Sequence, residues 1–308
     1  MKTIKGLPQK RKKNKEKREK LPIGRDHVIT HRGLEPSHAN FFSESSFEAF
    51  QDQLSRGFGG IEFDPNPTKD GIIVMHDSNL SRPTGGKDTR NVADVTTVEI
   101  KQIPLKNGRI PTFDEVLNLI ASSDAPVNAL HLKSRFQTPE TLRRLINSLR
   151  KHEDALSKII VFDVKADTAR QLKTEFPNLR LAPSIADPYD ISRYNTSVGG
   201  TLMTIEDAIA LKNEGVIDGV WGDEWDTQGE NGSGKQFYTK ENFDRLHEVG
   251  LFIALVTPEL HGTSPGLYGG ESHADAKDTE TLFRRIRQVK LAGGDYFCTD
   301  YPQEVAEL

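Results

Sequence analysis

The sequence predicts an α/β protein built as a single (β/α)8 TIM barrel, and three observations support this prediction. Short runs rich in valine and isoleucine alternate with helical patterns along most of the chain, which requires parallel strands joined by right-handed crossovers. Eight of these runs are prominent, the number that closes such a barrel. Residue types suited to catalysis end several different strands, where the active face of a barrel lies. A doubly wound open sheet is the alternative, although no glycine-rich phosphate loop stands at a strand–helix turn.

The strands are expected where β-branched residues cluster between polar or glycine-rich stretches. A further run, Ile72–His76, is expected as a hairpin-like extra strand beside the second main strand. The eight main strands, in chain order, are His27–Thr30, Ile61–Asp64, Val127–Lys133, Lys158–Val164, Leu179–Ile185, Gly219–Gly222, Leu251–Thr257 and Tyr296–Asp300.

The helices are expected where apolar residues recur three or four positions apart. The polar stretches Gly222–Tyr238 and Gly262–Lys277 are expected to form long loops over the active face. The predicted helices are Ser45–Arg56, Phe113–Ile120, Pro139–Leu149, Thr168–Phe176, Ile205–Leu211, Asn242–Val249 and Thr281–Leu291.

Charge is distributed unevenly along the 308 residues. Ten of the 41 basic and two of the 45 acidic residues lie in the first 20 positions, so the remainder has a balance of −12. Repulsion and the lack of apolar residues predict a disordered tail over residues 1–22, followed by the barrel over residues 23–308. A solubilising role is expected for the tail, with weak contact to an anionic membrane as its other candidate role. The acidic body argues against a specific nucleic-acid partner.

The remaining bulk features fit a cytoplasmic protein. The single cysteine, Cys298, excludes an internal disulfide and agrees with a reducing compartment. No run approaches the roughly 20 apolar residues of a membrane span, and no secretory signal is recognisable. The oligomeric state stays open.

Two carboxylates and two imidazoles carry the functional prediction. Glu62 and Asp64 are two positions apart on one strand, so their side chains face the same side. Such a pair repels unless a cation or proton lies between its members, and oxygen ligands favour Mg²⁺, Ca²⁺ or Mn²⁺. His31 and His76 can share acid and base duties near neutral pH. Each of these residues, taken alone, is also compatible with an ordinary structural position.

Two positively charged residues, Arg32 and Lys133, are candidates for binding phosphate. Arg32 offers a planar fork for phosphate oxygens, and Lys133 adds a point charge. Salt bridges from Arg32 and Lys133 to Glu62 or Asp64 are the alternative interpretation, and they are compatible with phosphate binding.

Several motifs together resemble the glycerophosphodiester phosphodiesterase family, from about Val28 to Pro302. They are HRG at 31–33, Glu44-Ser45 before a helix, IEFDPNPTKDGIIVMHDSNLSRPT at 61–84, PTFDEVL at 111–117 and CTDYP at 298–302. The resemblance implies a TIM barrel that hydrolyses a small phosphodiester with one divalent cation. The roles it implies are His31 and His76 as the acid/base pair, Glu62 and Asp64 as metal ligands, Arg32 and Lys133 as phosphate contacts, and Glu44 near the metal or substrate.

The chain departs from the family pattern at two positions. The family usually has E-x-K on the third strand, where this chain has His131-Leu132-Lys133. As a ligand, His131 would favour Mn²⁺ or Zn²⁺ over Ca²⁺; a hydrogen-bonding role beside the cation is the alternative. Ser45 replaces the more usual asparagine. The candidates for a substrate pocket are Glu44, which precedes the first helix, and Trp221, Glu259 and His261, which lie at the ends of other strands.

Three functions therefore stay open. The leading one is a metal-dependent phosphodiesterase that converts glycerophosphodiesters, or related deacylated lipids, to glycerol phosphate and an alcohol. The second is a phospholipase D-like lysolipid phosphodiesterase that releases a cyclic phosphate. The third is a barrel that has lost catalysis and acts as a binding protein.

Overall fold

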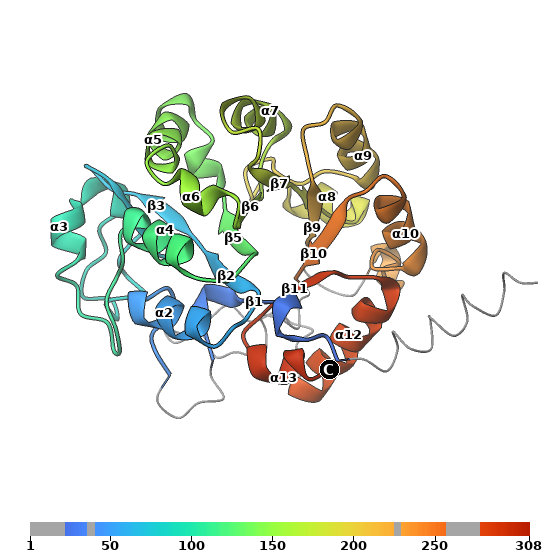
Figure 1. Cartoon of the computed structure of the whole chain (residues 1–308), viewed down its shortest axis with the longest axis horizontal. Coiled ribbons are helices and arrows are strands. Elements are labelled where there is room, and N and C mark those ends of the chain that lie inside the picture. Colours follow the sequence, from blue (N-terminus) through green and yellow to red (C-terminus); the bar gives the residue numbers. More distant parts are fainter. Residues whose placement is uncertain (1–21, 36–40, 225–228, 257–277) are drawn as a thin grey trace, which may run out of the picture.

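A computed structural model describes residues 22–35, 41–224, 229–256 and 278–308. Strands occupy the centre and helices surround them, as Figure 1 shows. The order of neighbours is β7-β6-β5-β2-β1-β11-β10-β9-β8, and every neighbouring pair is parallel. The strands of this sheet are β1 (Val28–Thr30), β2 (Gly60–Phe63), β5 (Asn128–His131), β6 (Ile159–Phe162), β7 (Arg180–Ala182), β8 (Ser184–Ile185), β9 (Gly219–Gly222), β10 (Phe252–Leu255) and β11 (Tyr296–Thr299).

The sheet closes on itself through one interrupted strand. Strands β7 and β8 are separated by Pro183, which has no amide hydrogen to donate to a ladder; β7 pairs with β6 and β8 pairs with β9. The Trp221 amide donates to the Pro183 carbonyl at 3.0 Å, and the Asp218 amide donates to the Leu181 carbonyl at 2.9 Å. The predicted (β/α)8 barrel and its eight main strands are confirmed, and the alternative open sheet is wrong.

A hairpin stands beside the second strand, as expected. Strand β3 (Pro65–Pro67) continues from β2 and pairs antiparallel with β4 (Ile72–Val74). Side chains alternate across β4: Ile72 and Val74 pack against the main core, whereas Ile73 belongs to a second, smaller core. His76 follows this hairpin by two residues.

All seven predicted helices form, with ends shifted by two residues or fewer. The seven are α2 (Phe47–Ser55), α4 (Phe113–Ser122), α5 (Pro139–Leu149), α7 (Ala166–Glu175), α9 (Ile205–Asn213), α10 (Lys240–Glu248) and α12 (Thr279–Ala292). Shorter helices were not predicted, because four to seven residues show little periodicity. They are α3 (Thr97–Ile100), α6 (Glu153–Leu156), α8 (Pro188–Tyr194) and α13 (Pro302–Ala306).

Two predictions lie outside the described residues: the basic tail, except for Pro22, and the whole loop at 262–277. The described part of the loop at 222–238 contains one 3-10 turn, Glu230–Gly232. None of the described helices has both the length and the apolar character needed to cross a bilayer.

Candidate active site

Three adjacent strands bring the predicted residues to one mouth of the barrel. His31 and Arg32 follow β1, Glu62 lies in β2 and His131 ends β5, and these strands are neighbours in the order β5-β2-β1. Arg32 adopts a left-handed backbone (φ 53°), and so does Gly33 (φ 67°). A Cβ at residue 33 would lie 3.0 Å from the Ala49 Cβ, so this turn requires glycine.

Glu62, Asp64 and His131 form a candidate metal centre. One ligand atom from each residue lies within 4.8 Å of the other two. In the part of the chain that the structure describes, no other group of three or more Asp, Glu, His or Cys residues meets this criterion. The His131 Nδ1 is 2.9 Å from Asp64 Oδ1 and 3.9 Å from Glu62 Oε1. The buried Asp64 Oδ2 accepts no hydrogen bond from any described residue. Two carboxylates, an imidazole and an unsatisfied buried oxygen fit a divalent cation.

The pKa values of Glu62 and Asp64 are shifted in opposite directions. Burial, and then the charge of Asp64, raise the pKa of Glu62 to about 8. Burial alone would raise the pKa of Asp64 too, but Lys133, His76 and His131 hold it well below its ordinary value. Glu62 therefore retains a proton at neutral pH in the metal-free protein. A divalent cation between the two carboxylates would replace that proton.

His131 is held between two acids on opposite sides of its ring. Its Nε2 lies 3.2 Å from Oδ2 of Asp163, which follows β6. Burial lowers the pKa of His131, yet Asp163 and Asp64 outweigh that effect and raise it to about 9. Without metal the ring is an imidazolium, so binding a cation through Nδ1 requires loss of a proton.

His31 is paired with an acid from the last strand. The His31 Nδ1 lies 2.6 Å from Oδ1 of Asp300, which follows β11, and both residues are buried. A carboxylate accepts, so Nδ1 carries the proton and Nε2 is the basic nitrogen. That Nε2 is 4.0 Å from Glu62 Oε2. The pair places an oriented imidazole beside the candidate metal centre.

His76 belongs to a network of charges. Its Nδ1 is 2.9 Å from Asp77 Oδ1, and Asp77 in turn accepts from Arg82 at 2.6 and 2.7 Å. Burial and the charges of Arg32 and Lys133 lower the pKa of His76 to about 3. The ring is therefore neutral while no anion occupies the site.

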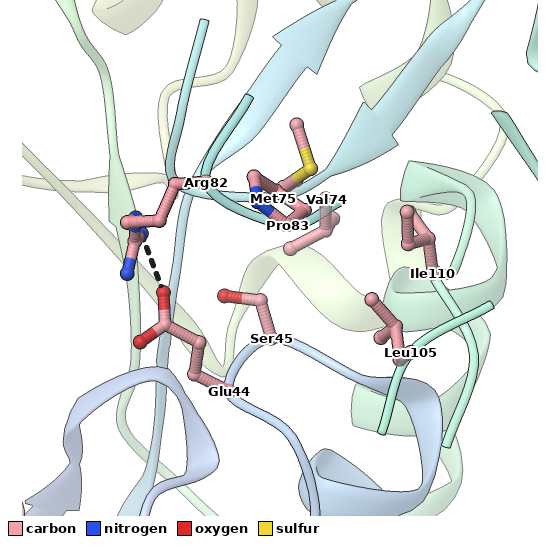
Figure 2. Close-up of a pocket in the computed structure, with 8 residues that line it drawn as sticks. All are labelled: Glu44, Ser45, Val74, Met75, Arg82, Pro83, Leu105 and Ile110. Atoms are coloured by element: carbon pink, nitrogen blue, oxygen red, sulfur yellow. Dashed lines mark hydrogen bonds and ion pairs between the residues drawn. The ribbon is translucent and has the colours of Figure 1, made fainter. Parts of the chain in front are cut away.

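A small pocket adjoins this network. Its accessible volume is about 10 Å³, room for about one water molecule. Figure 2 shows Glu44 and Arg82 facing each other on one side and Leu105 and Ile110 on the other. The Arg82 guanidinium donates to Glu44 Oε1 at 2.7 Å. Glu44 also lies 3.7 Å from Arg32 Nη1, so this acid connects the two arginines.

Both predicted phosphate contacts reach the mouth. The Lys133 Nζ lies 3.0 Å from Asp64 Oδ1 and donates to the His76 carbonyl at 2.9 Å, while Arg32 Nε is 3.6 Å from Asp64 Oδ2. The salt bridges considered from the sequence are thus present. Arg135, which was not predicted, also donates to the His76 carbonyl, at 3.0 Å.

The structure describes two of the four candidate pocket residues, Glu44 and Trp221. Trp221 is 2% exposed, and its ring stacks on Phe162 at 3.9 Å while Phe162 stacks on His131 at 4.5 Å. The Phe162 ring thus lies between Trp221 and His131, and the Trp221 side chain is buried against it. Glu259 and His261 lie outside the described residues.

Sequence reasoning missed Asp163 and Asp300, both partners of histidines. Each directly follows a strand of the barrel, which is the one local signal that could have identified them. Asp300 also lies in the CTDYP motif, although that motif gave no role to its acid.

Comparisons with known proteins agree with the candidate site, because they identify phosphodiesterases as similar proteins. The sequence model described as "Glycerophosphoryl diester phosphodiesterase family" matches residues 31–216. A glycerophosphodiester phosphodiesterase of Caldanaerobacter subterraneus is 32% identical over 164 residues, which is 50% of this chain and 64% of that protein. The match therefore spans less than two thirds of the relative's length.

Solved structures share the fold at lower identity. One from Galdieria sulphuraria, assigned as a glycerophosphodiester phosphodiesterase, has a TM-score of 0.64 and 18% identity and covers 93% of this chain and 97% of its own. A phosphodiesterase from Oleispira antarctica, in complex with the product sn-glycerol-3-phosphate, has a TM-score of 0.58 and 17% identity, with coverage of 91% and 94%.

Proposed function

Because the chain belongs to the glycerophosphoryl diester phosphodiesterase family, we propose that it hydrolyses glycerophosphodiesters, or related deacylated lipids, to glycerol phosphate and an alcohol. The observation that carries the proposal is the group Glu62, Asp64 and His131 at the barrel mouth, with ligand atoms within 4.8 Å. The cations of Arg32 and Lys133 lie beside it. The glycerol phosphate in the Oleispira relative is a product of the same chemical class.

Glu62, Asp64 and His131 would hold one divalent cation, which is Mg²⁺, Mn²⁺ or Ca²⁺, or Zn²⁺ given the imidazole. When bound, the cation supplies neutralisation of phosphate charge and stabilisation of the transition state. Arg32 and Lys133 bind the phosphate oxygens, and their present contacts with Asp64 are exchanged for contacts with the substrate.

The two imidazoles divide the proton transfers. His31, oriented by Asp300, accepts through Nε2 the proton of the attacking water. The bond from phosphorus to the alcohol oxygen breaks, and His76 in its protonated form donates to the leaving alkoxide. The negative phosphodiester offsets Arg32 and Lys133, the two cations that lower the pKa of His76, so substrate binding favours the protonated form.

Phosphorus NMR of metal-stripped protein tests the proposal, with glycerophosphodiesters and lysophospholipids supplied with Mg²⁺, Mn²⁺, Ca²⁺ or Zn²⁺. We expect glycerol phosphate from the glycerophosphodiesters only when a cation is present, and its loss in His31→Ala. Accumulation of a cyclic phosphate from a lysolipid would favour the phospholipase D-like alternative. If the protein bound a glycerophosphodiester but turned it over with none of the cations, the result would favour the third candidate function, a barrel that binds without catalysis.

A further inference from the structure

Asp163 ends the fourth barrel strand in an unusual conformation. It follows β6, its side chain is 11% exposed, and its backbone is left-handed at φ 57°. Of the four non-glycine residues with positive φ in the described ranges, Asp163, Arg32 and Ser45 all border the mouth. Such conformations cost free energy and persist where the surrounding structure enforces them.

Gln137 enforces the position of Asp163 relative to the strand that carries His131. The Gln137 side-chain amide donates to the Leu132 carbonyl and to the Asp163 carbonyl, both at 2.8 Å. Its side-chain oxygen accepts from the Lys165 amide, also at 2.8 Å. One side chain thus ties the turns after β5 and β6 together.

The ring of His131 is restrained on its faces as well as at its nitrogens. It stacks on Phe162 with centroids 4.5 Å apart and an interplanar angle of 17°, and Phe162 stacks on Trp221 at 3.9 Å and 13°. Within this stack Nδ1 points to Asp64 and Nε2 points to Asp163, at 2.9 and 3.2 Å.

We propose that Asp163 is a positioning residue for His131: its carboxylate accepts the Nε2–H and so directs the Nδ1 lone pair toward a cation held with Glu62 and Asp64. The inference rests on the proposed function, because it requires that a cation binds there. An acid behind a ligating imidazole fixes the tautomer and makes the nitrogen a better donor.

Calorimetric titration of the metal-free protein with MnCl2 and CaCl2 tests the proposal without using activity. Asp163→Asn keeps a residue that tolerates positive φ and can still accept weakly, whereas Asp163→Gly removes the acceptor without backbone strain. The matched control is Asp167→Asn, the same substitution four residues along the chain at a side chain that is 98% exposed. The melting temperature of each metal-free variant checks its folding.

We expect the Kd for Mn²⁺ to rise roughly 10- to 100-fold in Asp163→Asn and further in Asp163→Gly, with a smaller change for Ca²⁺. Asp167→Asn should match the parent protein. In a His131→Ala background the Asp163 substitutions should have no further effect.

Two results would overturn the inference while leaving the proposed function intact. One is Mn²⁺ binding by both Asp163 variants within twofold of the parent while His131→Ala binds weakly. The other is an equal loss from Asp163→Asn with and without His131, which would show that the carboxylate acts by another route. If the parent protein bound none of the cations, the metal-dependent function itself would fall.

Discussion

Replacing Asp300 by asparagine is the most direct test of the roles given to the two histidines. The His31 Nδ1 and Asp300 Oδ1 are 2.6 Å apart and both residues are buried, with 6% and 1% exposure. A buried hydrogen bond to a charged group contributes about 1.5–3 kcal/mol. If that contribution is made to the imidazolium formed in the transition state, its loss lowers kcat roughly 10- to 160-fold.

The pH profile separates this role from a merely structural one. His31 acts as the base only when neutral, and without Asp300 its charged form loses a partner. The acidic limb of kcat should therefore move to lower pH in Asp300→Asn. Stopped assays by phosphorus NMR at saturating substrate and metal, over several pH values, would measure both effects.

Asp295→Asn is the matched control, because Asp295 precedes β11 and so lies at the end of the strand opposite to Asp300. Its carboxylate accepts hydrogen bonds from the Ile253 amide and from His247 Nε2. It should lower stability without moving the pH profile. Turnover of Asp300→Asn within twofold of the parent, with an unchanged acidic limb, would refute the reasoning. So would a loss of turnover that only parallels a loss of metal affinity.

Three further predictions concern metal binding and stability. Cation at 100 times its Kd should raise the free energy of unfolding by about 2.7 kcal/mol, and Glu62→Gln should abolish this increment in urea titrations, whereas the exposed Glu140→Gln should retain it. Phe162→Ala should cost about 3–5 kcal/mol by chemical denaturation, since it removes the ring that stacks between His131 and Trp221; an unchanged midpoint would contradict this. Glu115→Gln keeps an oxygen that can accept from the Thr112 amide but removes a negative charge from the first turn of α4, so it should cost about 0.3–1 kcal/mol near neutral pH. Burial opposes, but hydrogen bonds from Thr112 and Arg109 hold the pKa of Glu115 at about 2, so its contribution is present above 4.5 and is lost as pH falls toward 2; a cost that is independent of pH would argue against the ionised cap.

The barrel could be predicted because its signals are local. Runs such as Ile159–Phe162 are wholly buried and rich in β-branched residues, and helix α5 begins at Pro139 and ends at Leu149 as its apolar periodicity predicts. The split of one strand at Pro183 was not predicted, since hydrophobic residues occur on both sides of the proline, Leu181 and Ala182 before it and Ile185 after it.

The predicted histidines, metal ligands and phosphate contacts converge because parallel strands place their carboxyl ends at one mouth. Their partners could not be found in the same way. Asp300 is 269 positions from His31 and Asp163 is 32 positions from His131, so neither pairing has a sequence pattern. The buried place of Trp221 follows from stacking across strands, which a single strand sequence does not encode.

The second, smaller core beside the barrel influences which residues of the site a substitution displaces. The cluster of Ile73, Met75, Leu80, Val92, Val95, Ile100 and Ile110 is separate from the main core. His76 lies at the edge of this unit, and its carbonyl is bound by Lys133 and Arg135 from the barrel. The segment that carries His76 thus adjoins the smaller core, whereas the strands that carry Glu62 and His131 pack in the main core. We therefore expect substitutions inside the smaller core to displace His76 more than Glu62 or His131, and so to alter the leaving-group side of the site while the barrel strands keep their packing.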